Sequence, residues 1–192
     1  YVEDAVTVGE GTLLLPGTIL RGKNLFIEAP TGVGKTISTI FPAVKAVGEG
    51  LADRIFYLTA KTITATVAKE TFALLEEQGY RAKVIQITAK EKLCLCEEMD
   101  CNPVNCPYAK GHFDRVNDAV FDLLQKSNLF TREEVLAQAK GYQVCPFEMS
   151  LDVAVWVDAI ICDYNYVFDP NVSLKRFFSD GVREDYLFLI DE

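Results

Sequence analysis

The fold of this 192-residue chain is constrained most by a short apolar segment that runs directly into a glycine-rich turn, Asn24-Leu-Phe-Ile-Glu28 followed by Ala29-Pro-Thr-Gly-Val-Gly-Lys-Thr36. Apolar residues at helical spacing come next, from Ile37 to Val47. A strand, a glycine-rich turn and a helix in this order form a phosphate-binding P-loop. We therefore predict an α/β protein that binds a nucleotide through its phosphates.

The residues of the turn have distinct roles in such a loop. Gly32 and Gly34 let the backbone bend so that its N–H groups point inward, and Lys35 reaches the β and γ phosphates. The Thr36 hydroxyl is placed to bind Mg²⁺ at the start of the helix. Ala29 stands where the common pattern has glycine, which requires a negative φ there. The predicted nucleotide-binding residues are Pro30, Thr31, Gly32, Val33, Gly34, Lys35 and Thr36.

A second apolar segment, Tyr186-Leu-Phe-Leu-Ile190, ends on two acids. P-loop enzymes place such acids at the end of a strand beside the P-loop strand. Asp191 is predicted to hold the Mg²⁺ shell, and Glu192 to orient and deprotonate the attacking water, so that Lys35, Asp191 and Glu192 are the catalytic residues. A strand that ends on two solvated carboxylates is the alternative. Because the chain stops at Glu192, we expect it to be a fragment.

Further strands and helices alternate along the chain. Three continuously apolar segments are typical of strands that are covered on both faces of a sheet. Helices are predicted between them, one with Gly79 as its C-cap and one that a capping box opens and Gly141 ends. This alternation predicts a three-layer RecA-type sheet. The predicted strands are 54–59, 83–88 and 159–163, and the predicted helices are 63–78, 113–126 and 131–141.

Composition limits the classes of function. The chain has 19 Lys and Arg against 28 Asp and Glu, a net charge of −9, so bulk charge cannot hold nucleic acid and any such role needs a local site. No apolar run is long enough for a membrane span, and the first residues lack the pattern of a signal peptide. We expect no membrane association and a cytoplasmic protein.

Six cysteines are unevenly distributed: Cys94, Cys96, Cys101 and Cys106 fall within thirteen residues, and Cys145 and Cys162 stand apart. In a reducing compartment such a cluster suggests metal ligands rather than disulfides. The residues alone leave zinc and an iron–sulfur cluster equally open, although the C-x₆-C-x₄-C spacing is looser than that of most zinc knuckles. Cys162 ends an apolar strand and is interpreted as a core thiol.

Five motifs occur in the order seen in the XPD/DinG-type iron–sulfur DNA helicases of superfamily 2. The chain resembles bacterial members of this family over residues 22–192. The resemblance implies an ATP-dependent helicase that moves 5′ to 3′ on single-stranded DNA, in repair or replication. It also implies a 4Fe-4S domain inserted into the first RecA-like motor domain. The motifs are Ala29–Thr36, Tyr57–Thr62, the cysteines from Cys94 to Cys145, Cys162–Val167 and Leu189–Glu192.

The resemblance also assigns site residues. It implies that Thr59, Lys61 and Thr62 touch single-stranded DNA, although an ordinary Thr N-cap beside a solvated Lys explains these residues equally well. Cys96 is an alternative to Cys94 as the first ligand of the cluster. The implied cofactors are ATP, Mg²⁺ and a 4Fe-4S cluster. The implied cluster ligands are Cys94, Cys101, Cys106 and Cys145.

The resemblance divides the chain into an atypical segment 1–22, motor-domain parts 23–92 and 150–192, and a cluster insertion 93–149. Residues 1–22 lack the family's adenine-contacting glutamine and instead resemble hexapeptide repeats, with Val8, Leu14 and Leu20 six residues apart.

The family's second motor domain is missing, so the isolated chain should be inactive. The alternative is a P-loop nucleotide-binding module with a structural zinc insertion. His112, the only histidine, is expected to be solvated on the surface.

Overall fold

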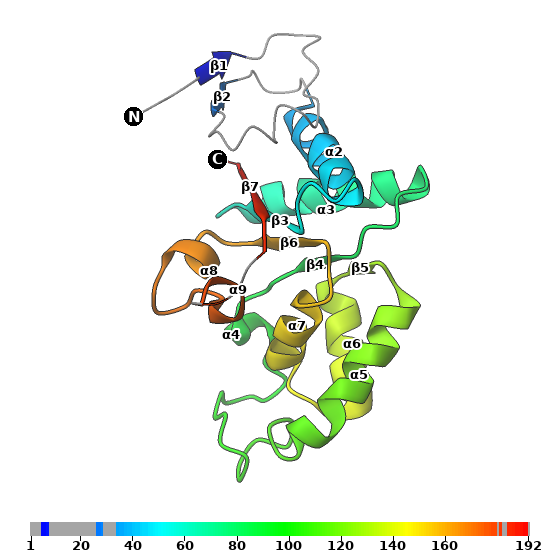
Figure 1. The fold of residues 1–192 in the computed structure, drawn as a ribbon. Helices are drawn as coiled ribbons and strands as arrows, with labels where there is room; N and C mark the ends of the chain where they lie inside the picture. Colours follow the sequence, from blue (N-terminus) through cyan, green and yellow to red (C-terminus); the bar gives the residue numbers. More distant parts are fainter. Residues whose placement is uncertain (1–4, 8–25, 29–33, 180, 182–183, 192) are drawn as a thin grey trace.

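A five-stranded parallel sheet forms the centre of the protein (Figure 1). The structure is a computed structural model that describes residues 5–7, 26–28, 34–179, 181 and 184–191. All neighbouring strands in this sheet are parallel, which confirms the α/β prediction. In sheet order the strands are β5 (Leu129–Phe130), β4 (Val84–Gln86), β6 (Ala159–Cys162), β3 (Arg54–Leu58) and β7 (Tyr186–Ile190).

Helices cover both faces of the sheet and make three layers (Figure 1). One face packs against α2 (Lys35–Gly48) and α3 (Thr62–Glu77). The other packs against α5 (His112–Lys126), α6 (Arg132–Tyr142) and α7 (Pro146–Ala154). The short helices are α4 (Lys90–Leu93), α8 (Asn165–Phe168) and α9 (Lys175–Phe178).

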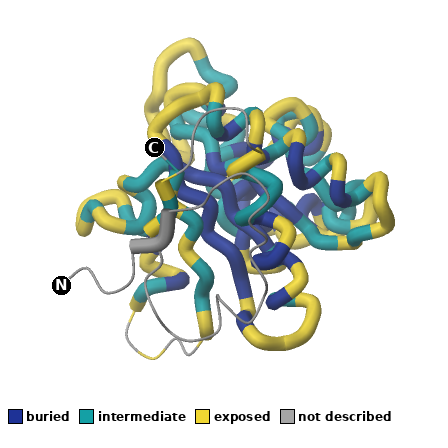
Figure 2. The backbone as a smooth tube through the Cα atoms, turned by 90° about the horizontal axis from the view of Figure 1, so that it is seen from above, coloured by how far each residue is buried: buried dark blue, intermediate teal, exposed yellow. Residues whose placement is uncertain are grey.

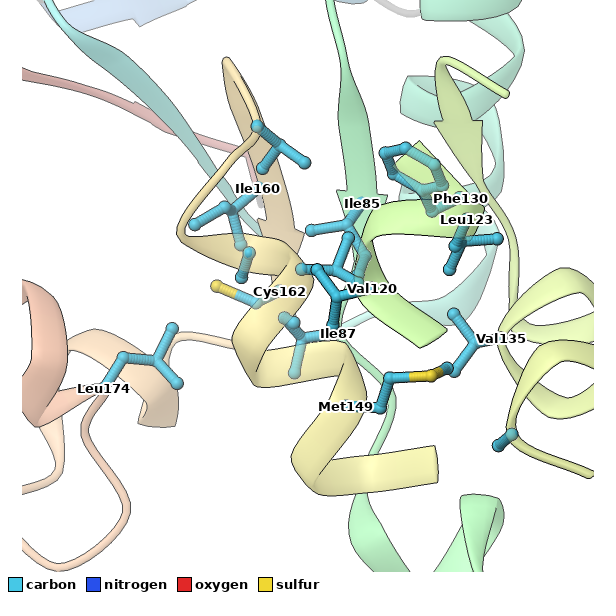
Figure 3. Close-up of a cluster of buried hydrophobic side chains, with 14 of the residues drawn as sticks. Ile85, Ile87, Val120, Leu123, Phe130, Val135, Met149, Ile160, Cys162 and Leu174 are labelled. Atoms are coloured by element: carbon cyan, nitrogen blue, oxygen red, sulfur yellow. The ribbon is translucent and has the colours of Figure 1, made fainter. Parts of the chain in front are cut away.

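Burial explains why β3 and β6 are apolar apart from Arg54 at the start of β3. All residues of β3 and β6 are buried, because each strand is covered on both faces. The buried tube in Figure 2 runs through the middle of the molecule, with exposed loops around it. Figure 3 shows the larger cluster, in which Ile85 and Ile160 of the sheet face Val120 of α5 and Met149 of α7.

The P-loop strand is not a member of this sheet. β2 (Phe26–Glu28) pairs in parallel with β1 (Ala5–Thr7) in a separate two-stranded sheet, whereas β7 pairs with β3. The prediction that β2 and β7 lie side by side is therefore wrong. A physical reason is that β2 has three residues, of which Phe26 is 53% exposed, so this strand buries little apolar surface.

The predicted helix ends are mostly confirmed. Thr131 Oγ1 accepts a hydrogen bond from the Glu134 backbone N–H at 3.3 Å, and Glu134 Oε2 accepts one from the Thr131 N–H at 2.8 Å, so the capping box is present. Gly79 follows α3 with φ of 98°. Gly141 does not end α6, because the helix continues to Tyr142 and Gln143 takes the left-handed conformation, with φ of 55°.

The Gln143 turn is held from two sides. The buried Val144 N–H donates to Ala139 O at 3.0 Å, which closes the turn. Arg115 of α5 donates to Tyr142 O at 2.9 Å and to Gln143 O at 2.6 Å. These tertiary contacts, rather than a glycine, set the end of α6. None of the described helices is long and apolar enough to cross a lipid bilayer.

Candidate functional site

The carboxyl ends of β3 and β7 meet the start of α2. Lys35 and Thr36 are the first residues of α2, preceded by Gly34 in the left-handed conformation with φ of 75°. This backbone favours glycine, as the predicted loop requires. Pro30, Thr31, Gly32 and Val33 lie outside the described residues, as does Glu192.

Asp191 follows β7 and is held by its neighbours. Its backbone N–H donates to Leu58 O at 3.0 Å, and the Tyr164 hydroxyl donates to its backbone carbonyl oxygen at 2.5 Å. The Tyr57 hydroxyl donates to the Asp191 carboxylate. The Thr36 side chain lies near the Tyr57 hydroxyl, where it acts to lower the pKa of the tyrosine. The structure therefore brings Thr36 and Asp191, two predicted Mg²⁺ ligands, to the same tyrosine.

Tyr57 is a site residue that sequence reasoning missed. Its side chain is 1% exposed, and its pKa is raised above the ordinary value, first by burial and then by the hydrogen bond to Asp191. Burial disfavours the charged phenolate, and a neighbouring carboxylate adds repulsion, so the hydroxyl stays protonated and donates. The tyrosine stands in the apolar run of β3, where a buried ring is the ordinary interpretation.

A groove of about 330 Å³ opens at the carboxyl ends of β3, β4 and β6. It contains the three residues predicted to touch DNA, Thr59, Lys61 and Thr62. Thr59 is buried, and its hydroxyl accepts a hydrogen bond from the Lys61 N–H at 3.2 Å. Lys61 is the N-cap of α3 and Thr62 the first helical residue, so the N-cap is a lysine and not a threonine.

Other charged side chains line the same groove. Lys69, Lys92 and Arg132 join Lys61, while the acids there are Glu133 and Asp163. Arg132 donates to Lys92 O at 2.8 Å and so links the start of α6 to α4. Forty residues separate this pair, which is why local sequence patterns gave no sign of it.

The five cysteines between β4 and α7 surround one small cavity of about 20 Å³. The cavity has room for about one water molecule. Cys96 Sγ lies 3.8 Å from Cys106 Sγ, and burial raises the pKa of Cys96 to about 11. Burial also raises the pKa of Cys145, the N-cap of α7. Cys162 is 3% exposed in the core, as predicted. The lining cysteines are Cys94, Cys96, Cys101, Cys106 and Cys145.

Within the described ranges, no three His, Cys, Asp or Glu side chains are gathered so that they could hold a metal ion. A tetrahedral zinc with bonds of about 2.3 Å would need every sulfur pair about 3.8 Å apart. The donor set is nevertheless all thiol, and thiolates are the ligands that iron–sulfur clusters use. The residues present fit such a group by their chemistry.

His112 is buried rather than solvated, with 4% exposure, so the surface prediction is wrong. It begins α5 and packs where this helix meets the start of α7. Its Nδ1 accepts a hydrogen bond from the Cys145 N–H at 3.2 Å, and burial lowers its pKa. In the described part of the chain its Nε2 has no hydrogen-bond partner. His112 thus supports the backbone of a predicted cluster ligand.

Comparisons with known proteins agree with this fold. A solved XPD helicase has a similar fold, with a TM-score of 0.58 and 17% sequence identity over 92% of this chain. The match spans 31% of the helicase chain. No curated protein matches. The DEAD_2 family model matches residues 76–192, more than half of the chain, from the end of α3 through the cysteines to the two acids. The chain therefore belongs to the DEAD_2 family of XPD/DinG-type helicase domains, which use ATP and Mg²⁺.

Proposed function

We propose that this chain is part of the first motor domain of an ATP-dependent DNA helicase that moves 5′ to 3′ on single-stranded DNA in repair or replication. The observation that carries the proposal is the meeting of Thr36 and Asp191 at Tyr57, beside a groove with four cationic side chains. Nucleotide chemistry and a phosphate-binding surface thus share one edge of the sheet, as coupling of hydrolysis to translocation requires.

The nucleotide is held by its phosphates. The N–H groups of residues 30–34 cradle them at the start of α2, and Lys35 neutralises the β and γ oxygens. Thr36 and Asp191 complete the Mg²⁺ shell, while Glu192 activates the attacking water. The arginine finger comes from a second motor domain, so the chain alone hydrolyses ATP slowly or not at all.

Single-stranded DNA lies in the groove. Lys61, Lys92 and Arg132 are exposed, so their charges reach backbone phosphates without a large desolvation cost. Tyr166 and Gln86 line the same groove and offer a ring and an amide to the bases. Glu133 and Asp163 offset part of the positive charge, which keeps the binding weak and sensitive to salt.

Cys94, Cys101, Cys106 and Cys145 would hold a 4Fe-4S cluster at the cysteine cavity, with Cys96 as the alternative to Cys94. When bound, the cluster supplies a redox-active crosslink between the cysteine loop and the start of α7. A structural zinc is the alternative occupant, and iron, sulfide and zinc analysis of anaerobically prepared protein decides between them.

Nucleotide titration tests the proposal. ATP and GTP analogues should bind with affinities within about tenfold of each other, a difference of about 1.4 kcal/mol, because the contacts are to phosphates. Lys35→Ala should abolish the binding of both, since it removes the cation on the β and γ phosphates. Lys45→Ala is the matched control, because Lys45 is an exposed lysine in the last turn of the same helix. Unchanged binding in Lys35→Ala would refute the P-loop assignment.

A further inference from the structure

The hydroxyl of Tyr57 stands out because it is a polar group among the buried apolar residues Ile55 to Leu58 of β3. Tyr57 lies opposite Ile161 of β6 and Leu189 of β7 in the parallel sheet. Its side chain packs in the core cluster that includes Ile40 and Val44 of α2. A buried hydroxyl needs a partner, and this one donates to Asp191 after β7, with the Thr36 side chain of α2 nearby.

Thr36 and Asp191 come from separate elements. Thr36 is fixed in the first turn of α2, and Asp191 follows a strand that pairs with β3. The Asp191 backbone is already held at both its N–H and its carbonyl, by Leu58 and Tyr164. The side chain still has rotational freedom about χ1 and χ2, and the Tyr57 hydroxyl restricts it.

We infer that Tyr57 is a positioning residue for the Mg²⁺–nucleotide site: its hydroxyl holds the Asp191 carboxylate in place before the metal binds. This inference rests on the proposed function. Ligands that are ordered in advance bind a metal more tightly, because less conformational freedom is lost on binding. Hydrogen bonds to ligating carboxylates are worth about 10- to 100-fold in metal affinity.

The donor direction matters for this role. The hydroxyl hydrogen points to the carboxylate, so it fixes one Asp191 oxygen and leaves the other oxygen for the metal or its water shell. Tyr57 acts through Asp191, so its effect should appear only when Mg²⁺ is present.

The test is a titration of Mg²⁺ into the chain bound to a fluorescent ATP analogue, followed for wild type and Tyr57→Phe. The substitution removes one oxygen and keeps the ring in the core. We expect the Mg²⁺ affinity to fall about tenfold. The affinity for the analogue in EDTA should change less than twofold. Tyr186→Phe is the matched control, because that hydroxyl donates to Phe177 O at 3.1 Å, away from Asp191.

A double-mutant cycle separates positioning from a general loss of stability. In the Asp191→Asn background, Tyr57→Phe should cause no further loss of Mg²⁺ affinity, because the carboxylate it positions is gone. Equal losses in EDTA and in Mg²⁺, or an additive loss in the double variant, would overturn the inference. So would an unchanged Mg²⁺ affinity in Tyr57→Phe. Absence of binding by wild type, or normal binding by Lys35→Ala, would overturn the proposed function as well.

Discussion

Arg54 of β3 forms hydrogen bonds with the end of α7 and the residue that follows it. Its guanidinium donates to Ala154 O at 2.6 Å and to Val155 O at 3.0 Å, and it lies 4.9 Å from the centre of the Phe177 ring. Glu184 pairs with it at 3.7 Å. Only 9% of the side chain is exposed, so these hydrogen bonds are made away from water.

Replacing Arg54 should therefore be costly. Arg54→Met keeps much of the apolar stem but leaves the two carbonyls without their donors, and we expect a loss of about 2–4 kcal/mol in the free energy of unfolding. Urea denaturation measures it. Arg176→Met is the control, because Arg176 forms an exposed ion pair with Asp152 at 2.7 Å and should cost less than about 1 kcal/mol. Equal losses would contradict the role given to Arg54.

Individual residues show where sequence reasoning succeeds and where it stops. Gly34 was predictable, because the turn before α2 needs a positive φ that glycine supplies. Tyr57 was not, because a hydroxyl inside an apolar run looks like a core ring until its partner is known. His112 was misjudged for a similar reason, since its burial depends on how α5 meets the start of α7.

Among the elements, helix α6 starts with the strongest local signal. The Thr131–Glu134 capping box satisfies backbone N–H groups that would otherwise lack partners. Thr131→Ala should lower the free energy of unfolding by about 1 kcal/mol. Thr66→Ala is the comparison, because the Thr66 hydroxyl bonds Thr62 O at 3.0 Å within α3 and its loss should be nearly neutral. A larger loss at Thr66 in chemical denaturation would argue against this ranking.

Elements with long periodic patterns were predictable, and short ones were not. The helix at 113–126 matches α5 within one residue, and the apolar strands match β3, β4 and β6. β5 has two residues, too few for any pattern, and it forms because β4 offers it a partner. α7 begins at Pro146, a favourable first helical residue.

The whole molecule has a net charge of −9, which repels nucleic acid. Binding must therefore come from the cationic side chains of the groove. Each lost phosphate contact should reduce the slope of log K against log salt by about 0.7 for single strands. Lys61→Ala and Arg132→Ala should each weaken binding of labelled single-stranded DNA and flatten this slope. Arg81→Ala, an exposed residue before the amino end of β4, should leave both unchanged. If all three variants behave alike, the groove is not the binding surface.

The position of β7 has a consequence for the behaviour of the chain in solution. Among the described strands it has a hydrogen-bonded neighbour, β3, on one side only. Phe188 is 42% and Ile190 57% exposed, and no charged residue interrupts the strand. An uncharged, apolar edge of this kind can pair with the same edge of another copy. Concentrated preparations of this chain should therefore aggregate through β7, and a lysine at position 188 or 190 should keep them dispersed.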